Sequence, residues 1–258
     1  MCVVRGHGNL LCNAADPRPT VDPEKDMTRT ALRAGGAIGI AHIVVAMIGF
    51  TLQNSKGIDI TLAADKANLT AFFVDGDAGT TFLGGYLELF GFLLFVPFAA
   101  ALYQLLRSGE GSGGFGAMTS GLAATIFIAT TLAPGFSAGA AALWMGTHGG
   151  DLAAVEVLNQ LRNTTYATSL AAYALFFAAV GISALLGGSL PKWLSLSALA
   201  IGGWLAFGVA FFADGQADLP GMVGLLWILA AGIWMLRGRI RHGGGAAPAS
   251  SAEAVSVG

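Results

Sequence analysis

The chain has 258 residues, of which 55% are hydrophobic and only 11% are charged, with 13 Lys and Arg against 15 Asp and Glu. A soluble domain usually carries about 25% charged residues, so these side chains are too few for a water-exposed surface and argue against a soluble enzyme. The net charge of −2 provides no basic patch for nucleic acid. We therefore expect an integral membrane protein, in which the 38 glycines would let helices pack closely.

Long gaps between charged residues indicate the membrane-spanning segments, because a charge in hydrocarbon is costly. A spanning helix needs about 20 apolar residues. The gaps predict an all-α integral membrane bundle of six transmembrane helices within residues 29–240. In chain order, the helices are expected at 32–53, 80–106, 115–146, 163–188, 193–213 and 219–237.

The stretch from Gly111 to Gly150 leaves two possibilities, since it is long enough for one helix kinked at Pro134 or for two short helices. With six crossings and the N-terminus inside, all but three of the 13 basic residues are cytoplasmic, whereas seven crossings distribute them almost evenly. Because cytoplasmic loops collect Lys and Arg, we predict six crossings with both termini cytoplasmic.

Residues 1–28 and 241–258 are predicted to be disordered cytoplasmic tails, because they combine Pro, Gly, Ser and Ala with few apolar runs. The first tail lacks the apolar segment of a signal peptide, so the first helix is expected to be an uncleaved membrane anchor. Met27 precedes a second start-like sequence and is a candidate initiator.

Two connections on the outer side carry structural signals. The segment from Ser55 to Thr80 is long enough for an interfacial helix, whose apolar side chains would face either the bilayer or the bundle. Asp151 follows two glycines and is a good N-cap for a helix that continues through Leu161. This outer extension is expected to pair with the end of the third span.

Two ionisable residues fall inside the predicted spans, and such residues are functional candidates by default. His42 lies on a stripe of small residues of the first helix, and Glu88 shares a face of the second helix with Gly84 and Gly91. Both are therefore expected to face neighbouring helices. Estimates of their depth place them either level with one another or about 20 Å apart, so a direct hydrogen-bonded pair is not favoured.

The fourth helix provides better partners for Glu88, because Arg162, Tyr166 and Tyr173 fall on one of its faces, and Tyr86 lies close to Glu88 in sequence. We predict a polar cavity that opens to the outer side, is lined by these five residues, and has His42 deeper inside. The alternative is that the same side chains only hydrogen-bond across helices and hold them in register.

No catalytic, metal-binding or cofactor-binding motif accompanies these residues. A haem would need two imidazoles facing each other within the bundle, and no zinc-protease motif or phosphate loop is present. The expected partners are the lipid bilayer, a small-molecule or lipid ligand, and a second copy bound through Gly and Ala faces.

Three runs carry a family resemblance: "RTALRAGGAIGIAH", "GGYLELFGFLLFVPFAAALYQLLR" and "LPKWLSLSALAIGG". Together they resemble uncharacterised bacterial multi-pass membrane proteins of a domain-of-unknown-function family. The resemblance covers Arg29 to about Arg239 and implies about six helices, a long first outer loop and a final helix before an arginine cluster. It implies no activity and no site residue.

Three functions remain compatible with the sequence. A small-solute or proton-coupled carrier would use Glu88 in its cavity. A membrane-embedded enzyme or redox subunit would act on a lipid or quinone, but the sequence lacks the grouped catalytic residues that an enzyme needs. A structural or assembly protein would bind partner helices. The carrier is favoured.

Overall fold

A computed structural model describes residues 3–5, 9–11, 23–58, 60–62, 64–111, 113–210 and 218–237 of the chain. Within these residues, six helices are long and apolar enough to cross a membrane, which confirms the predicted all-α fold with six spans. Two short strands, β1 (Val3–Arg5) and β2 (Asn9–Leu11), pair antiparallel in the segment that was predicted to be disordered. The predicted tail at 241–258 lies outside the described residues.

The observed spans begin earlier than predicted at two places. Helix α1 (Pro23–Gln53) begins before residue 32, and proline suits a first helical turn, where its missing N–H costs no hydrogen bond. Helix α6 (Leu152–Gly187) begins before the predicted span at residue 163, and the predicted N-cap at Asp151 is confirmed, because its carboxylate accepts a hydrogen bond of 3.0 Å from the Ala153 N–H. The remaining helical spans are α3 (Ala78–Glu110), α7 (Lys192–Ala210) and α8 (Asp218–Leu236).

The third span is continuous, which decides between the two interpretations of the stretch around Pro134. It consists of α4 (Phe115–Thr130), the π-helical segment η2 (Thr131–Phe136) and α5 (Ser137–Thr147). Pro134 lies inside η2, so the wider π turn absorbs the proline. The Thr131 hydroxyl donates a hydrogen bond of 2.7 Å to the Phe127 carbonyl next to this segment.

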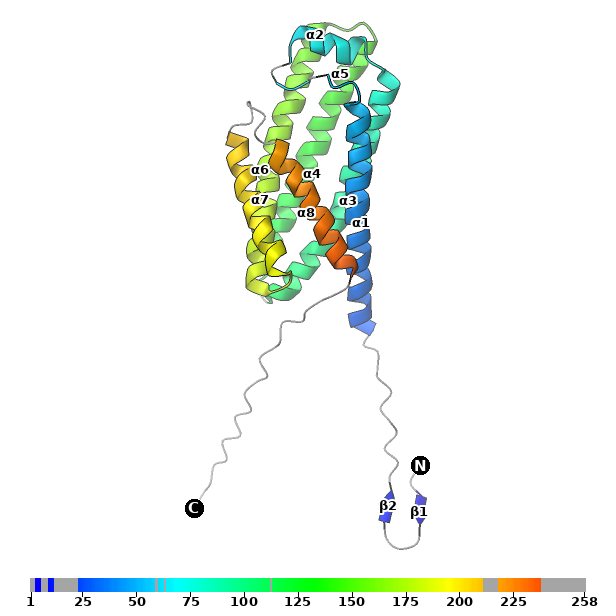
Figure 1. Cartoon of the computed structure of the whole chain (residues 1–258), viewed down its shortest axis with the longest axis vertical. Coiled ribbons are helices and arrows are strands. Elements are labelled where there is room, and N and C mark those ends of the chain that lie inside the picture. Colours follow the sequence, from blue (N-terminus) through cyan, green and yellow to red (C-terminus); the bar gives the residue numbers. More distant parts are fainter. Residues whose placement is uncertain are drawn as a thin grey trace.

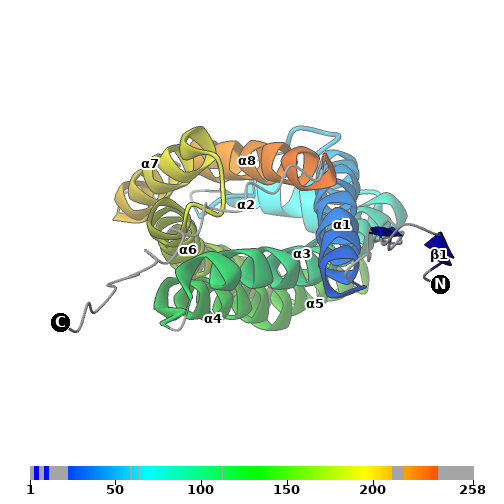
Figure 2. The same ribbon diagram turned by 90° about the horizontal axis from the view of Figure 1, so that it is seen from below.

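Successive spans alternate in direction (Figure 1), so α1 begins and α8 ends at the same end of the bundle. Seen from below, α3, α4 and α5 form one side, α6 and α7 lie together, and α8 crosses the opposite side towards α1 (Figure 2). Large apolar side chains face outward on several helices, for example Leu122 at 58% and Leu226 at 63% exposure. This outer surface fits a hydrocarbon environment.

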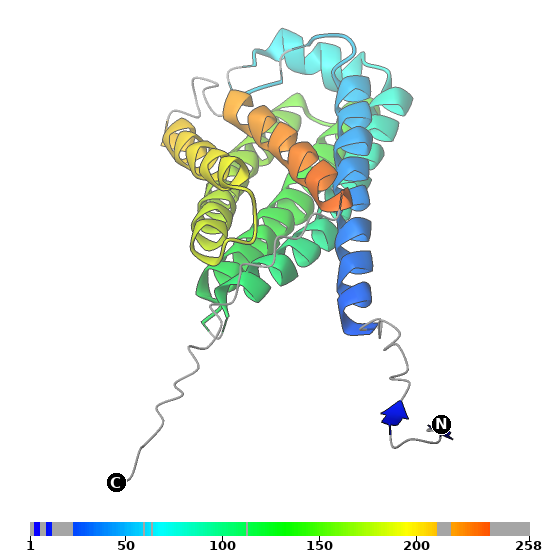
Figure 3. The same cartoon turned by 60° about the horizontal axis from the view of Figure 1, so that its bottom comes forward.

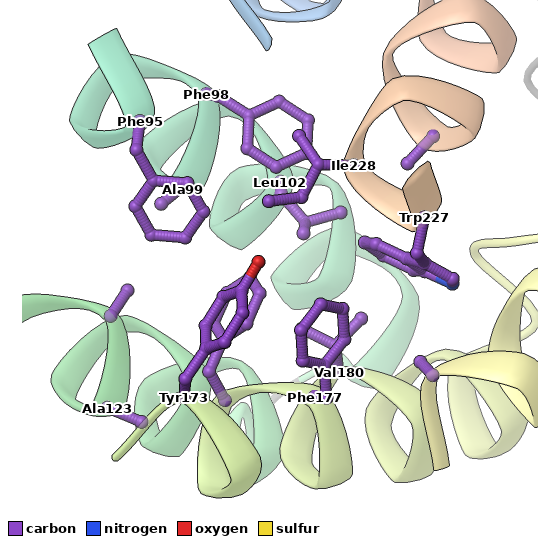
Figure 4. Close-up of a cluster of buried hydrophobic side chains, with 14 of the residues drawn as sticks. Phe95, Phe98, Ala99, Leu102, Ala123, Tyr173, Phe177, Val180, Trp227 and Ile228 are labelled. Atoms are coloured by element: carbon purple, nitrogen blue, oxygen red, sulfur yellow. The ribbon is translucent and has the colours of Figure 1, made fainter. Parts of the chain in front are cut away.

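Aromatic side chains fill the centre of the bundle. Phe127 of α4 stacks on Tyr173 of α6 with ring centroids 4.4 Å apart, and Phe177 meets Trp227 of α8 at 5.3 Å. Figure 4 shows this cluster with Phe95, Phe98 and Leu102 contributed by α3. The buried cluster that contains these side chains has members from all six spans and joins them together.

Glycines bring α1 and α3 to backbone contact. A methyl group added at Gly91 would lie 2.6 Å from the Ala46 nitrogen, and one added at Gly84 would lie 2.9 Å from the Gln53 nitrogen. Only residues without a side chain permit this separation. The close approach places Gln53, at the end of α1, directly beside the first half of α3.

The connection between α1 and α3 folds as a cap over the end of the bundle opposite the start of α1 (Figure 1). It contains α2 (Lys66–Leu69) and the π-helical segment η1 (Thr70–Val74). Leu69, Phe72 and Phe73 are buried in a second apolar cluster together with Leu143 and Val155. Of the two orientations left open by the sequence, these side chains therefore face the bundle.

Candidate functional site

A cavity of about 590 Å³ lies beneath the cap, between the halves of the spans that are nearer to it. Ligand-binding pockets commonly measure about 300–1,000 Å³. Five of the six residues singled out from the sequence line it, and they come from two helices: Tyr86 and Glu88 of α3, and Arg162, Tyr166 and Tyr173 of α6. The fold thus brings together side chains that are far apart in the chain.

Glu88 is held in place by the end of α1. The Gln53 amide donates a hydrogen bond to the Glu88 carboxylate, and the Gln53 side chain packs over Gly84, one turn before Glu88. Glu88 is only half-buried although it lies within the bundle, because its side chain faces the cavity. The Glu88 carboxylate is therefore accessible from the cavity.

Arg162 lies across the cavity from the same carboxylate. The two charges attract one another, yet no salt bridge between them is among the contacts of the described residues. Gly139 of α5 makes room for the arginine, since a methyl group there would lie 3.1 Å from Arg162 Cδ. An acid and a guanidinium therefore face one cavity without directly neutralising each other.

The three tyrosines lie at different levels of the cavity wall. Tyr86 is 70% exposed and Tyr166 is 37% exposed, whereas Tyr173 is 3% exposed and lies where the cavity meets the aromatic cluster. The Tyr173 hydroxyl has no hydrogen-bond partner in the described structure. Figure 4 shows this hydroxyl pointing away from α6 towards α3. A buried hydroxyl left without a partner is costly, so it marks a position where a ligand or water atom would be stabilised.

His42 does not line the cavity, in contrast to the prediction that places it deeper in the same cavity. Its Nδ1 atom forms a hydrogen bond of 2.7 Å with the Gly91 carbonyl, and its ring lies against Phe92 and Phe95. Glu88 and His42 thus have different partners, as expected from their estimated depths. The close approach of α1 and α3 at Gly91 explains why a backbone carbonyl is within reach of the imidazole.

Several residues that line the cavity were not among the candidates identified from the sequence. Gln53 continues the small-residue stripe of α1, four residues beyond Gly49, and this spacing was the signal that could have found it. Asn163 also lines the cavity, and its amide donates a hydrogen bond of 3.0 Å to the Ile60 carbonyl, which ties the cap to α6. Thr131 and Gly135 come from η2, and π-helical segments are frequent at functional sites.

The remaining wall of the cavity is apolar, and much of it is aromatic. It includes Phe50 of α1, Phe92 of α3, Phe136 of η2 and Leu225 of α8. A single polar region, formed by Glu88, Arg162 and their neighbours, is thus combined with a larger apolar surface. Such a cavity suits a molecule that has a polar group attached to an apolar body.

Metal ligation and similarity to known proteins provide no further assignment. Within the part of the chain that the structure covers, no three His, Cys, Asp or Glu side chains lie together as a potential metal site. No protein-family model, curated protein or solved structure matches the chain.

Proposed function

We propose that this protein is an integral membrane carrier that binds a small amphipathic molecule in the cavity between Glu88 and Arg162. The observation that carries the proposal is the pair of opposite charges that face one cavity of about 590 Å³ without forming a salt bridge. An enzyme on the same scaffold would need a nucleophile, a base and an orienting group in contact, and the cavity residues do not supply such a set.

The proposed topology has both termini in the cytoplasm and the capped end of the cavity outside. Arg33, Arg107 and Lys192 lie near one end of the bundle, and Lys56 and Lys66 near the other. The excess of basic residues at the first end supports its assignment to the cytoplasmic side. The resemblance to bacterial multi-pass proteins supports a plasma-membrane location.

The experiment is solvent extraction of the purified protein followed by mass spectrometry of the small molecules that it retains. We expect one molecule to be retained by the wild type and to be depleted in Glu88→Gln and Arg162→Met. Each substitution removes a charge-assisted hydrogen bond worth about 1.5–3 kcal/mol, or about tenfold or more in affinity. Counterflow of the identified molecule in proteoliposomes then tests transport.

The matched controls are Glu156→Gln and Arg107→Met, which remove the same charges from positions outside the cavity. They should retain the molecule as the wild type does. Equal retention by all four variants would contradict the proposal. If the wild type retains the molecule but shows no counterflow, the protein binds the molecule and is not a carrier.

A further inference from the structure

The cavity has a side wall that differs from the others, between α1 and α8. These helices are in backbone contact near the start of α1 and the end of α8. A methyl group added at Gly36 would lie 2.6 Å from the Gly232 carbonyl oxygen. Beyond this crossing α8 inclines away from α1, as Figures 1 and 3 both show. Met47 and Phe50 of α1, and Met222 of α8, then line the cavity from opposite sides.

The rim of this side wall is apolar and exposed. Phe50 is 39% exposed and Met222 is 37% exposed, and both line the cavity. The outer end of the cavity, by contrast, is lined by Ile60 and Phe73 of the cap, both of which are buried in the second apolar cluster. In a bilayer, the side wall between α1 and α8 faces lipid, and the cap faces water.

The polar end of the cavity carries two charges of opposite sign. The Arg162 guanidinium has no hydrogen bond to any described residue, and a guanidinium matches a phosphate group with two parallel hydrogen bonds. Glu88 presents a carboxylate across from it, which attracts an ammonium group. A ligand that carries both a phosphate and an ammonium would therefore satisfy both sides.

We propose that the cavity holds the headgroup of a zwitterionic phospholipid, which enters sideways between α1 and α8 while its acyl chains remain in the bilayer. Its phosphate binds Arg162, its ammonium group binds Glu88, and the chains pass over Phe50 and Met222. This inference rests on the proposed binding function and names its ligand class. Only the headgroup and the adjoining glycerol occupy the cavity.

The test uses the full chain in vesicles of phosphatidylethanolamine and phosphatidylglycerol in equal amounts. Phe92, which lines the cavity, is replaced by the photoreactive residue p-benzoylphenylalanine, and lipid adducts are identified by mass spectrometry. Phe136 of η2 is a second position in the same cavity. Two matched positions serve as controls: Phe98 of α3, with 0% exposure in the core, and Leu226 of α8, with 63% exposure on the outer surface.

We expect the probe at Phe92 to capture phosphatidylethanolamine about tenfold more often than phosphatidylglycerol, because the latter has no ammonium group for Glu88. The probe at Leu226 should capture both lipids equally, and the probe at Phe98 neither. Adding Glu88→Gln should remove the preference at Phe92. Adding Arg162→Met should lower the capture of both lipids there, because both carry the phosphate that Arg162 binds.

Three results would overturn the inference: no lipid adduct at Phe92 or Phe136, equal capture of both lipids there, or a preference that survives Glu88→Gln. Failure of this inference can be distinguished from failure of the proposed function. If the purified wild type retains a water-soluble solute that Glu88→Gln and Arg162→Met release, while Phe92 captures no lipid, the cavity binds a ligand that is not a phospholipid.

Discussion

The contact between α1 and α3 allows a quantitative prediction for Gly91→Ala. The added methyl group would lie 2.6 Å from the Ala46 nitrogen and 2.8 Å from Ala46 Cα, both of which are backbone atoms that cannot rotate away. Ordinary contact begins at 3.4 Å, so the helices must separate by about 0.8 Å. Directed along the His42–Gly91 hydrogen bond, that displacement would stretch it from 2.7 Å to about 3.5 Å.

The free energy of unfolding should fall by about 2 kcal/mol. Overpacking of this kind costs about 1–3 kcal/mol, and weakening the buried hydrogen bond of His42 costs about 1 kcal/mol more. The higher helix propensity of Ala compared with Gly offsets about 1 kcal/mol of this loss of stability. The net change corresponds to about a 30-fold larger unfolded fraction.

The assay is unfolding by SDS in mixed micelles, followed by circular dichroism of the helices. The control is Gly203→Ala on α7, where an added methyl group meets nothing within 4 Å. This variant should be as stable as the wild type or gain up to about 1 kcal/mol from propensity alone. If Gly91→Ala is as stable as Gly203→Ala, the two helices are not in backbone contact and the packing argument is wrong.

Three further predictions concern separate parts of the structure. Gly139→Val should push the Arg162 side chain aside and deplete the retained molecule in the extraction assay, whereas Gly203→Val should not. Trp227→Phe removes an indole hydrogen bond of 2.9 Å to the Leu194 carbonyl and should cost about 1–2 kcal/mol of stability in the SDS assay. Hydrogen bonds from the Thr80 hydroxyl and backbone N–H lower the pKa of Asp77. Because the folded pKa lies below the unfolded value of about 3.9, its stabilisation is present above that pH and is lost as pH falls further. Asp77→Ala should therefore unfold at a lower temperature than the wild type at pH 7, and a difference that persists unchanged at pH 2 would contradict this assignment.

The six spans could be predicted from the positions of charged residues, because hydrocarbon tolerates so few of them. The ends of the helices could not be predicted in this way, because the part of a helix that extends beyond the membrane can carry charged residues without cost. Helix α6 shows this: its first turns include Glu156 and Arg162, which a search for uncharged stretches leaves out. Asp151 was the better signal, because N-capping depends on a local hydrogen bond and is independent of the membrane.

The candidate site was predictable where it depends on charged and phenolic side chains. Arg162, Tyr166 and Tyr173 share a face of α6 that the 3.6-residue period reveals, and Tyr86 was included because it lies two residues from Glu88. The neutral partner Gln53 and the backbone partner of His42 were not predictable in the same way. Gly91 accepts a hydrogen bond through its carbonyl, and every residue has one, so only the three-dimensional approach of α1 to α3 selects it.

The contact of α1 and α8 at Gly36 and Gly232 is a point about which α8 could tilt, and such a tilt would change the width of the cavity's side wall. From Gly232 to Met222 the helix rises about 15 Å at 1.5 Å per residue. Tilting α8 by about 10° around the crossing would therefore displace Met222 by about 2.6 Å while the two glycines stay in contact. A small rotation about this crossing thus sets the width of the side wall. Trp227, five residues from Gly232, would move by about 1.3 Å, half as far as Met222.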